Sequence, residues 1–264
     1  MARHSTFADA RAADIGPGIN SLSPSDLKEA LRRGYADFSA KPSHPIFLSI
    51  IYPVISFLLI QAAAGRDLWP LIYPLIAGFA LVGPLAAIGL YELSRRRERG
   101  EEARWRDAFA VFRSPALANI ITLGAILTAI FLVWLYVAQA LYLAIMGPPA
   151  TQSLTAFFSE ILTTERGWLL ILAGNAVGLV FACLAFVLSV ISFPLLLDRN
   201  VDLRTAIATS VRVVERNPRV MAFWGVIVSG GLVLGFLPAG IGLAIVLPIL
   251  GHATWHLYRR AVSA

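Results

Sequence analysis

The chain consists of long apolar stretches separated by short, arginine-rich segments. A helix needs roughly 20 predominantly apolar residues to cross the hydrocarbon core of a bilayer. Hydrophobic residues make up 58% of the sequence and charged residues only 14%, which is too apolar for an ordinary soluble domain. Backbone groups in lipid must be satisfied within helices or closed barrels, and the alternating pattern of a barrel is absent. The sequence therefore predicts an all-α fold, a polytopic membrane helix bundle. Six spans are expected, at residues 46–64, 68–92, 116–146, 167–197, 220–236 and 239–258.

The basic residues test this six-span topology. With six crossings, every lysine and arginine except Arg66 and Arg166 falls on one side of the membrane. Because basic residues are retained on the cytoplasmic side, both termini are expected in the cytoplasm. The net charge of +6 is then explained by contact with anionic headgroups, and no nucleic-acid partner is expected. Residues 1–22 are polar and predict a disordered cytoplasmic tail, whereas residues 23–264 predict a single membrane domain.

A short amphipathic pattern occurs twice at a constant offset and a third time in weaker form. Each copy places apolar residues on one helical stripe, ends at a proline and leads into an odd-numbered span. We expect each copy to form a helix on the cytoplasmic surface, with its stripe packed on the membrane face of the bundle. The three stripes are Leu27, Leu31, Tyr35 and Phe38 before Pro42; Trp105, Phe109 and Phe112 before Pro115; and Leu203, Ile207, Val211 and Val214 before Pro218.

The even-numbered spans also share an ending. Residues 84–96 and 248–260 align a proline, an aromatic residue, a leucine and two arginines, and residues 194–199 form a fainter third copy. Agreement at both ends of the unit predicts a threefold internal repeat of a cytoplasmic amphipathic helix followed by a transmembrane hairpin. The units are expected at about residues 23–97, 98–199 and 200–260.

Histidines gather at the cytoplasmic end of this bundle. His252 and His256 lie four residues apart on one helix face, and His44 and Glu92 are expected at the same depth. Two histidines with a carboxylate could bind zinc or another transition metal. The sequence between them lacks the metalloprotease glutamate, so no adjacent general base is present. The alternative interpretation is that these histidines belong to an interfacial aromatic belt beside Trp255.

Few polar residues fall inside the predicted spans, and none of them carries a charge in the middle of a span. This argues against a proton-coupled pump but leaves a passive channel open. Asn119 and Asn175 are candidates for hydrogen bonds between helices or for the lining of a path. Two pairs of glycines permit close helix packing or oligomerisation: Gly174 with Gly178, and Gly231 with Gly235.

Three segments, residues 25–38, residues 78–84 with 89–96, and residues 251–259, resemble a bacterial integral-membrane family known as a domain of unknown function. The resemblance implies a six-span inner-membrane protein and brings no activity or functional residue. Because catalytic motifs are absent, we favour a non-enzymatic scaffold, assembly or accessory factor, with another membrane protein or a second copy as its partner. The alternatives are a channel or transporter for a small solute and a metal-binding membrane protein.

Overall fold

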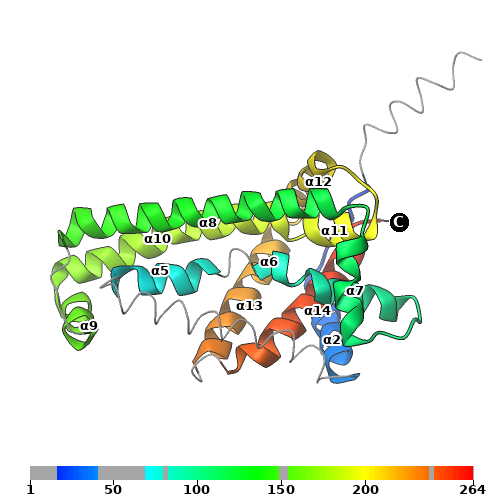
Figure 1. The fold of residues 1–264 in the computed structure, drawn as a ribbon, viewed down its shortest axis with the longest axis horizontal. Helices are drawn as coiled ribbons and strands as arrows, with labels where there is room; N and C mark the ends of the chain where they lie inside the picture. Colours follow the sequence, from blue (N-terminus) through cyan, green and yellow to red (C-terminus); the bar gives the residue numbers. More distant parts are fainter. Residues whose placement is uncertain (1–16, 41–68, 80–82, 149–153, 238–240, 264) are drawn as a thin grey trace, which may run out of the picture.

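The computed structural model describes residues 17–40, 69–79, 83–148, 154–237 and 241–263 (Figure 1). The predicted first span at residues 46–64, His44 and most of the predicted disordered tail lie outside the described residues. The fold is all-α, as the sequence predicts. The helices are α2 (Pro24–Ala40), α5 (Trp69–Phe79), α6 (Gly83–Ala86), α7 (Ile88–Glu98), the 3₁₀ helix η2 (Trp105–Arg113), α8 (Leu117–Met146), α9 (Leu154–Thr163), α10 (Glu165–Ser189), α11 (Ser192–Asp198), α12 (Leu203–Arg216), α13 (Pro218–Phe236) and α14 (Leu243–Ala261).

Local sequence signals explain where several helices begin. The side chain of Asp202 caps α12 by accepting a hydrogen bond from the Thr205 amide at 2.6 Å. α13 starts at Pro218. The amide of the first helical residue has no partner within the helix, so proline, which has no amide proton, fits this position. The predicted fourth span is divided into α10 and α11, because Pro194 in the first turn of α11 has no amide proton to continue the hydrogen bonds of α10.

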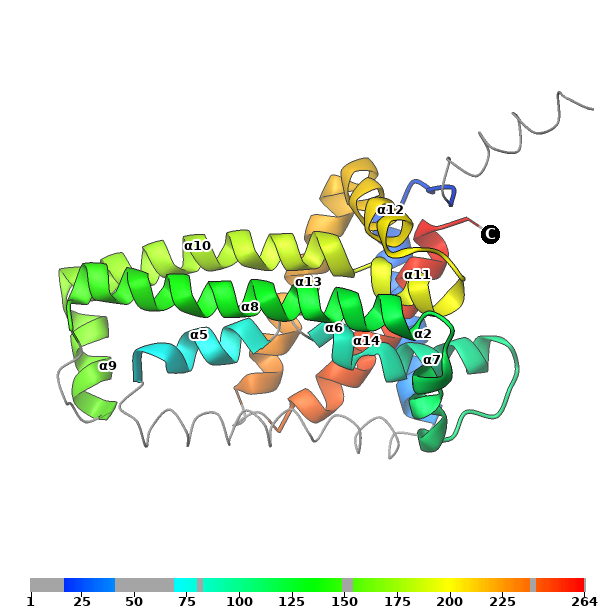
Figure 2. The same ribbon diagram turned by 45° about the horizontal axis from the view of Figure 1, so that its top comes forward.

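The helices α8 and α10 form a long antiparallel hairpin, with α5 beside it and α9 across its far end (Figures 1 and 2). Among the described residues, four helical segments are long and apolar enough to cross a membrane, and they correspond to the second to fifth predicted spans. The predicted sixth span forms the helix α14 but does not belong to these four. The six-span count therefore stays a prediction. The four segments are Pro70–Glu98, Leu117–Met146, Glu165–Asp198 and Pro218–Phe236.

The other end of the molecule is a densely packed body that we call the cap. It consists of residues 17–40, 88–113, 192–216 and 250–263, and it contains most of the fully buried side chains. The C-terminal half of α14 runs through it, with Trp255 and Tyr258 completely buried. This burial by protein, together with the polar residues in the same half of α14, distinguishes α14 from a lipid-facing span.

The helices of the cap associate in three pairs. η2 packs on α7, α12 packs on α11, and α2 packs on α14, while α7, α11 and α14 also contact one another. η2 and α12 thus each lie against the end of the predicted hairpin that precedes them in the chain. The first surface helix, α2, lies against the end of the last predicted hairpin. This arrangement is compatible with a threefold repeat, but the repeat itself stays a prediction.

Small residues beside the predicted stripes are buried against the protein in both α2 and α12. In α2 the buried positions are Leu27, Ala30, Gly34 and Phe38, whereas Tyr35 of the predicted stripe is 60% exposed. α12 buries Ala206, Thr209, Ser210 and Val213 completely, whereas Leu203, Ile207 and Val214 of its predicted stripe are partly buried against the same core. The physical reason is close helix approach: a Cβ atom on Gly34 would lie 2.6 Å from the Ala253 amide nitrogen.

Candidate functional site

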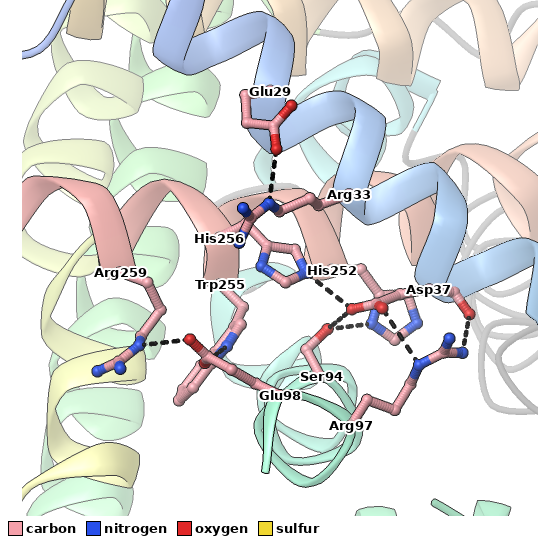
Figure 3. A network of polar contacts seen from close by, with 10 residues as sticks. All are labelled: Glu29, Arg33, Asp37, Ser94, Arg97, Glu98, His252, Trp255, His256 and Arg259. Atoms are coloured by element: carbon pink, nitrogen blue, oxygen red, sulfur yellow. Dashed lines mark hydrogen bonds and ion pairs between the residues drawn. The ribbon is translucent and has the colours of Figure 1, made fainter. Parts of the chain in front are cut away.

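A largely buried polar cluster lies where α2, α7 and α14 meet, and we call it the Asp37 cluster (Figure 3). α2 contributes Asp37, α7 contributes Ser94 and Arg97, and α14 contributes His252 and His256. Residues three or four positions apart share a helix face, so α7 and α14 each present two polar groups to the same point. The close crossing of α2 over α14 brings the Asp37 carboxylate between them.

Asp37 is the centre of the cluster. Its Oδ2 atom accepts hydrogen bonds from the Ser94 hydroxyl at 2.5 Å and from Nε2 of His256 at 2.8 Å. Nε of Arg97 lies 3.2 Å from the other carboxylate oxygen, and Nη1 of Arg97 donates to the Asp37 backbone carbonyl at 3.0 Å. The carboxylate side chain is only 11% exposed. One buried carboxylate therefore binds donors from two other helices.

The hydrogen bonds determine which nitrogen of His252 carries a proton. The single hydroxyl proton of Ser94 is donated to Asp37, so Ser94 Oγ must accept from Nδ1 of His252, which lies 2.8 Å away. Nδ1 of His252 is therefore protonated. Its Nε2 atom is buried and makes no hydrogen bond with the described residues.

The donors around Asp37 outweigh the cost of its burial. Desolvation alone raises the pKa of the Asp37 carboxyl, but the hydrogen bonds from His256 and Ser94 lower it, and the net pKa lies below the ordinary value of 3.8. The carboxylate is therefore ionised at neutral pH. A buried carboxylate with this set of donors is a stable partner for α7 and α14.

Further polar contacts tie the same helices together beside the cluster. Nε1 of Trp255 donates to Glu98 at 3.1 Å, and Glu98 also pairs with Arg259 at 3.1 Å. The Tyr258 hydroxyl donates to Asp198 of α11 at 2.8 Å, and Arg259 reaches the same carboxylate at 3.1 Å. These contacts connect α14 with both α7 and α11.

The Asp37 cluster contains serine, histidine and aspartate but not the geometry of a hydrolase. In a catalytic triad the histidine accepts the serine proton, whereas Ser94 here donates its proton to the carboxylate. Ser94 is completely buried and His252 is 1% exposed, so the hydroxyl does not face solvent. This arrangement can fix three helices relative to one another, and it offers no exposed nucleophile.

The residues predicted to bind a metal are distributed over two clusters. His252 and His256 both belong to the Asp37 cluster, whereas buried Glu92 pairs with Arg95 at 2.6 Å and with Arg96 at 2.9 Å. His44 lies outside the described residues. Within the part of the chain that the structure describes, no group of three or more histidine, cysteine, aspartate or glutamate side chains is placed to hold a metal ion.

Asp37, Ser94 and Arg97 were not among the residues singled out from the sequence. One signal could have identified Asp37. At the constant offset of the two strong copies, its counterpart is the fully buried Val213, so a carboxylate replaces an apolar residue at a position that packs against protein. A charged residue at such a position requires partners from other helices.

The two intramembrane asparagines take part in separate packing contacts. Asn119 donates from Nδ2 to the Val201 carbonyl at 3.3 Å, near the beginning of α8. Asn175, in the middle of α10, accepts from the Tyr73 hydroxyl of α5 at 2.7 Å. It also donates to the carbonyl of Ile171 in its own helix at 2.8 Å.

The four glycines face neighbouring helices to different degrees. A Cβ atom on Gly178 would lie 3.1 Å from Trp134 of α8, and one on Gly174 would lie 4.0 Å from Leu141. In α13, both Gly231 and Gly235 face α14: added Cβ atoms would approach Val246 and Leu250 to 3.2 Å and Leu243 to 2.9 Å, respectively. The contacts at Gly178, Gly231 and Gly235 are close.

Comparison with known proteins covers the part of the chain that connects the hairpin to the cap. Residues 72–198, from α5 to α11, match the model of the family described as predicted integral membrane protein (DUF2189). No curated protein and no solved structure matches the chain. The apolar helices agree with this match, and residues 72–198 are similar to a family of predicted integral membrane proteins of unknown function.

Proposed function

We propose that the protein is a non-enzymatic scaffold, assembly or accessory factor of the bacterial inner membrane, whose cap lies in the cytoplasm and holds a partner protein. The observation that carries this proposal is the Asp37 cluster. Its reactive side chains bind one another across three helices and are buried, with Ser94, His252 and His256 at most 8% exposed. A cluster of this kind contributes to a defined shape rather than to a reaction.

Exposed arginines on the outer surface of the cap also support the proposal. Arg204 and Arg216 on α12 and Arg219 at the start of α13 are exposed, and within the described residues they make no ion pair. We call these three residues the α12 arginines. Exposed arginines that are not held in an ion pair are available for a carboxylate on another molecule, and an arginine fork binds a carboxylate in a defined geometry. An acidic segment of a membrane-protein partner has the complementary charge.

The positions of the two asparagines weigh against a solute path. Gly178 of α10 lies beside Trp134 of α8. Because the two helices are antiparallel, Asn175, which precedes Gly178, lies farther from the start of α8 than Trp134 does. At 1.5 Å per residue, Asn119 and Asn175 are then separated by roughly 20 Å or more along the hairpin. Both side chains bond to neighbouring backbone or side-chain groups. Because these bonds hold both side chains, they are described better as separate packing contacts than as the lining of one channel.

The test is co-purification at native expression in a mild detergent, followed by mass spectrometry. We expect the wild-type chain to retain a membrane-protein partner, and the triple variant Arg204→Glu, Arg216→Glu and Arg219→Glu to lose it. Arg166→Glu is the matched control, because Arg166 is exposed at the end of the hairpin far from the cap. A wild-type chain that purifies alone, or a partner that the triple variant retains, would contradict the proposal. Solute flux through liposomes that contain only this chain would favour the channel instead.

A further inference from the structure

The side chains of the 3₁₀ helix η2 lie along three edges. In a 3₁₀ helix, residues three positions apart eclipse one another. Trp105, Ala108 and Val111 therefore share one edge, on which Ala108 and Val111 are buried. Arg106, Phe109 and Phe112 share a second edge, and all three are exposed. We call this second set the outer edge of η2.

Contacts on the other edges of η2 fix the direction in which the outer edge points. A Cβ atom on Gly89 of α7 would lie 3.1 Å from Cβ of Ala108, so the two helices are in close contact. Asp107 lies 3.3 Å from Arg96 of α7, and its carboxylate accepts from the Arg104 amide at 2.8 Å. η2 is thereby held against α7 from one side, with the outer edge directed away from the protein.

The outer edge exposes two phenyl rings. Phe109 is 48% exposed and Phe112 is 68% exposed. Their rings lie almost parallel at a centroid distance of 6.3 Å, and Trp105 meets Phe109 edge-on at 6.1 Å. Burial in an apolar environment would be favourable for both phenyl rings. An exposed apolar patch with a polar rim is typical of a binding surface.

The position of η2 in the chain indicates what covers this surface. η2 ends at Arg113, and α8, which is apolar and long enough to cross a membrane, begins at Leu117. Ile121 in the first turns of α8 is 60% exposed. Three residues cannot carry η2 far from the bilayer surface at which α8 enters, because an extended residue spans at most ~3.6 Å. If α8 enters the bilayer within its first turns, the outer edge lies at the level of the lipid headgroups.

Basic residues complete this surface. The Arg106 guanidinium lies 5.4 Å from the centroid of the Trp105 ring, and Arg113 is exposed at the end of η2. Neither arginine makes an ion pair with the described residues. Interfacial helices that bind lipid combine aromatic residues at the acyl boundary with arginines that meet anionic headgroups. η2 offers both features within nine residues.

We propose that the outer edge of η2, together with Arg113, is an interfacial lipid-binding site. Phe109 and Phe112 insert at the boundary between headgroups and acyl chains in the leaflet that α8 enters. Arg106 and Arg113 bind the phosphates of anionic lipids. The site fixes the cap against the membrane surface, and it does not depend on which partner the cap holds.

The single cysteine of the chain permits a direct test. In a Cys183→Ser background, the Phe112→Cys variant is labelled at its new cysteine with an environment-sensitive fluorophore. The labelled protein is reconstituted at one chain per nanodisc, in phosphatidylcholine with or without phosphatidylglycerol. Leu132→Cys, at an exposed position in the middle of α8, is the lipid-embedded control. Ser21→Cys, at an exposed position beside the C-terminal end of α14, is the aqueous control.

We expect the label at position 112 to show blue-shifted emission and to be quenched by lipids that carry a nitroxide near the headgroup. The label at position 132 should be quenched best by a deep nitroxide, and the label at position 21 by neither. Addition of phosphatidylglycerol should shift the label at position 112 further to the blue, and the double variant Arg106→Gln and Arg113→Gln should remove this dependence.

Two results would overturn the proposal. A label at position 112 that behaves like the label at position 21 would place the outer edge in water. A label that is shielded from water but not quenched by any lipid nitroxide would place it against protein. Because Phe112 is exposed and η2 is held by its other edges, Phe112→Cys should leave the fold unchanged, which circular dichroism of the purified variant verifies.

Discussion

Replacement of Asp37 by alanine should release α2 from the cap. The change removes a carboxylate that accepts from Ser94, His256 and Arg97, and it leaves these donors without their partner. Hydrogen bonds to charged groups contribute ~1.5–3 kcal/mol each. These contributions do not add, and removal of one partner from a buried pair costs ~3–5 kcal/mol. Since the Arg97 side chain is 33% exposed, screening by solvent reduces this figure, and we expect ~3 kcal/mol.

A loss of ~3 kcal/mol corresponds to a roughly hundredfold larger equilibrium constant for opening. Hydrogen exchange of residues 24–40, measured by mass spectrometry in nanodiscs, reports this opening directly. Asp37→Asn should have an intermediate effect, because one amide oxygen still accepts while the charge is lost. Glu29→Gln is the control, because Glu29 is in exposed ion pairs with Arg32 and Arg33 and should leave the exchange unchanged. If Asp37→Ala exchanges like the wild type, the interpretation of the cluster as a structural contact is wrong.

Three further predictions concern packing, pH and the hairpin. Gly34→Val should displace α2 from α14 and lower the stability by ~1–3 kcal/mol through overpacking, because even a Cβ atom would lie 2.6 Å from the Ala253 amide nitrogen. Thermal unfolding in detergent measures this loss of stability. An unchanged midpoint would contradict the close crossing of the two helices. Because the pKa of Asp37 is lowered, its contribution to stability is complete above the ordinary carboxyl pKa and is lost as the pH falls through the lowered value. The opening constant of α2, obtained from hydrogen exchange after correction for its intrinsic pH dependence, should therefore be larger at about pH 3 than at about pH 5, and Asp37→Asn should remove most of this difference. Trp134→Phe should cost ~1 kcal/mol by removing the hydrogen bond from Nε1 to the Pro74 carbonyl at 3.0 Å, and increased exchange of α5 would show it.

Hydrophobic length predicts much of this fold from the sequence. The second to fifth predicted spans correspond to the four apolar helical segments, because segment length and composition alone determine them. The predicted surface helices that carry the stripes at residues 27–38 and 203–214 are also present, as α2 and α12. These features depend on local sequence, so periodicity is sufficient to find them.

The inward faces of these helices could not be predicted in the same way. Periodicity identifies the large apolar residues, but close helix crossings require small ones, so Ala30 and Gly34 were missed as contact residues. η2 was expected to be an α-helix, and in a 3₁₀ helix Phe109 and Phe112 point outward. A stripe calculated with the α-helical period assigns such a segment to the wrong face.

The candidate site was predicted only in part because its geometry is tertiary. The spacing of His252 and His256 placed them on one face of a helix, and both do lie in one cluster. Their partners Asp37 and Ser94 come from helices 219 and 158 residues away in the chain, respectively. The predicted position of Glu92 in the membrane suggested it as the acidic partner of the histidines, but Arg95 and Arg96 of its own helix bind it instead.

The most direct test of the Asp37 cluster as a contact that holds the cap together is a double-mutant cycle between Asp37 and His256. Stability of the α2 segment is measured by hydrogen exchange for Asp37→Asn, His256→Gln and the double variant. Because Nε2 of His256 lies 2.8 Å from the carboxylate of Asp37, we predict a coupling free energy within the ~0.5–3 kcal/mol typical of residues in contact. Additive effects, with no coupling free energy, would contradict a direct stabilising contact between α2 and α14 at this site.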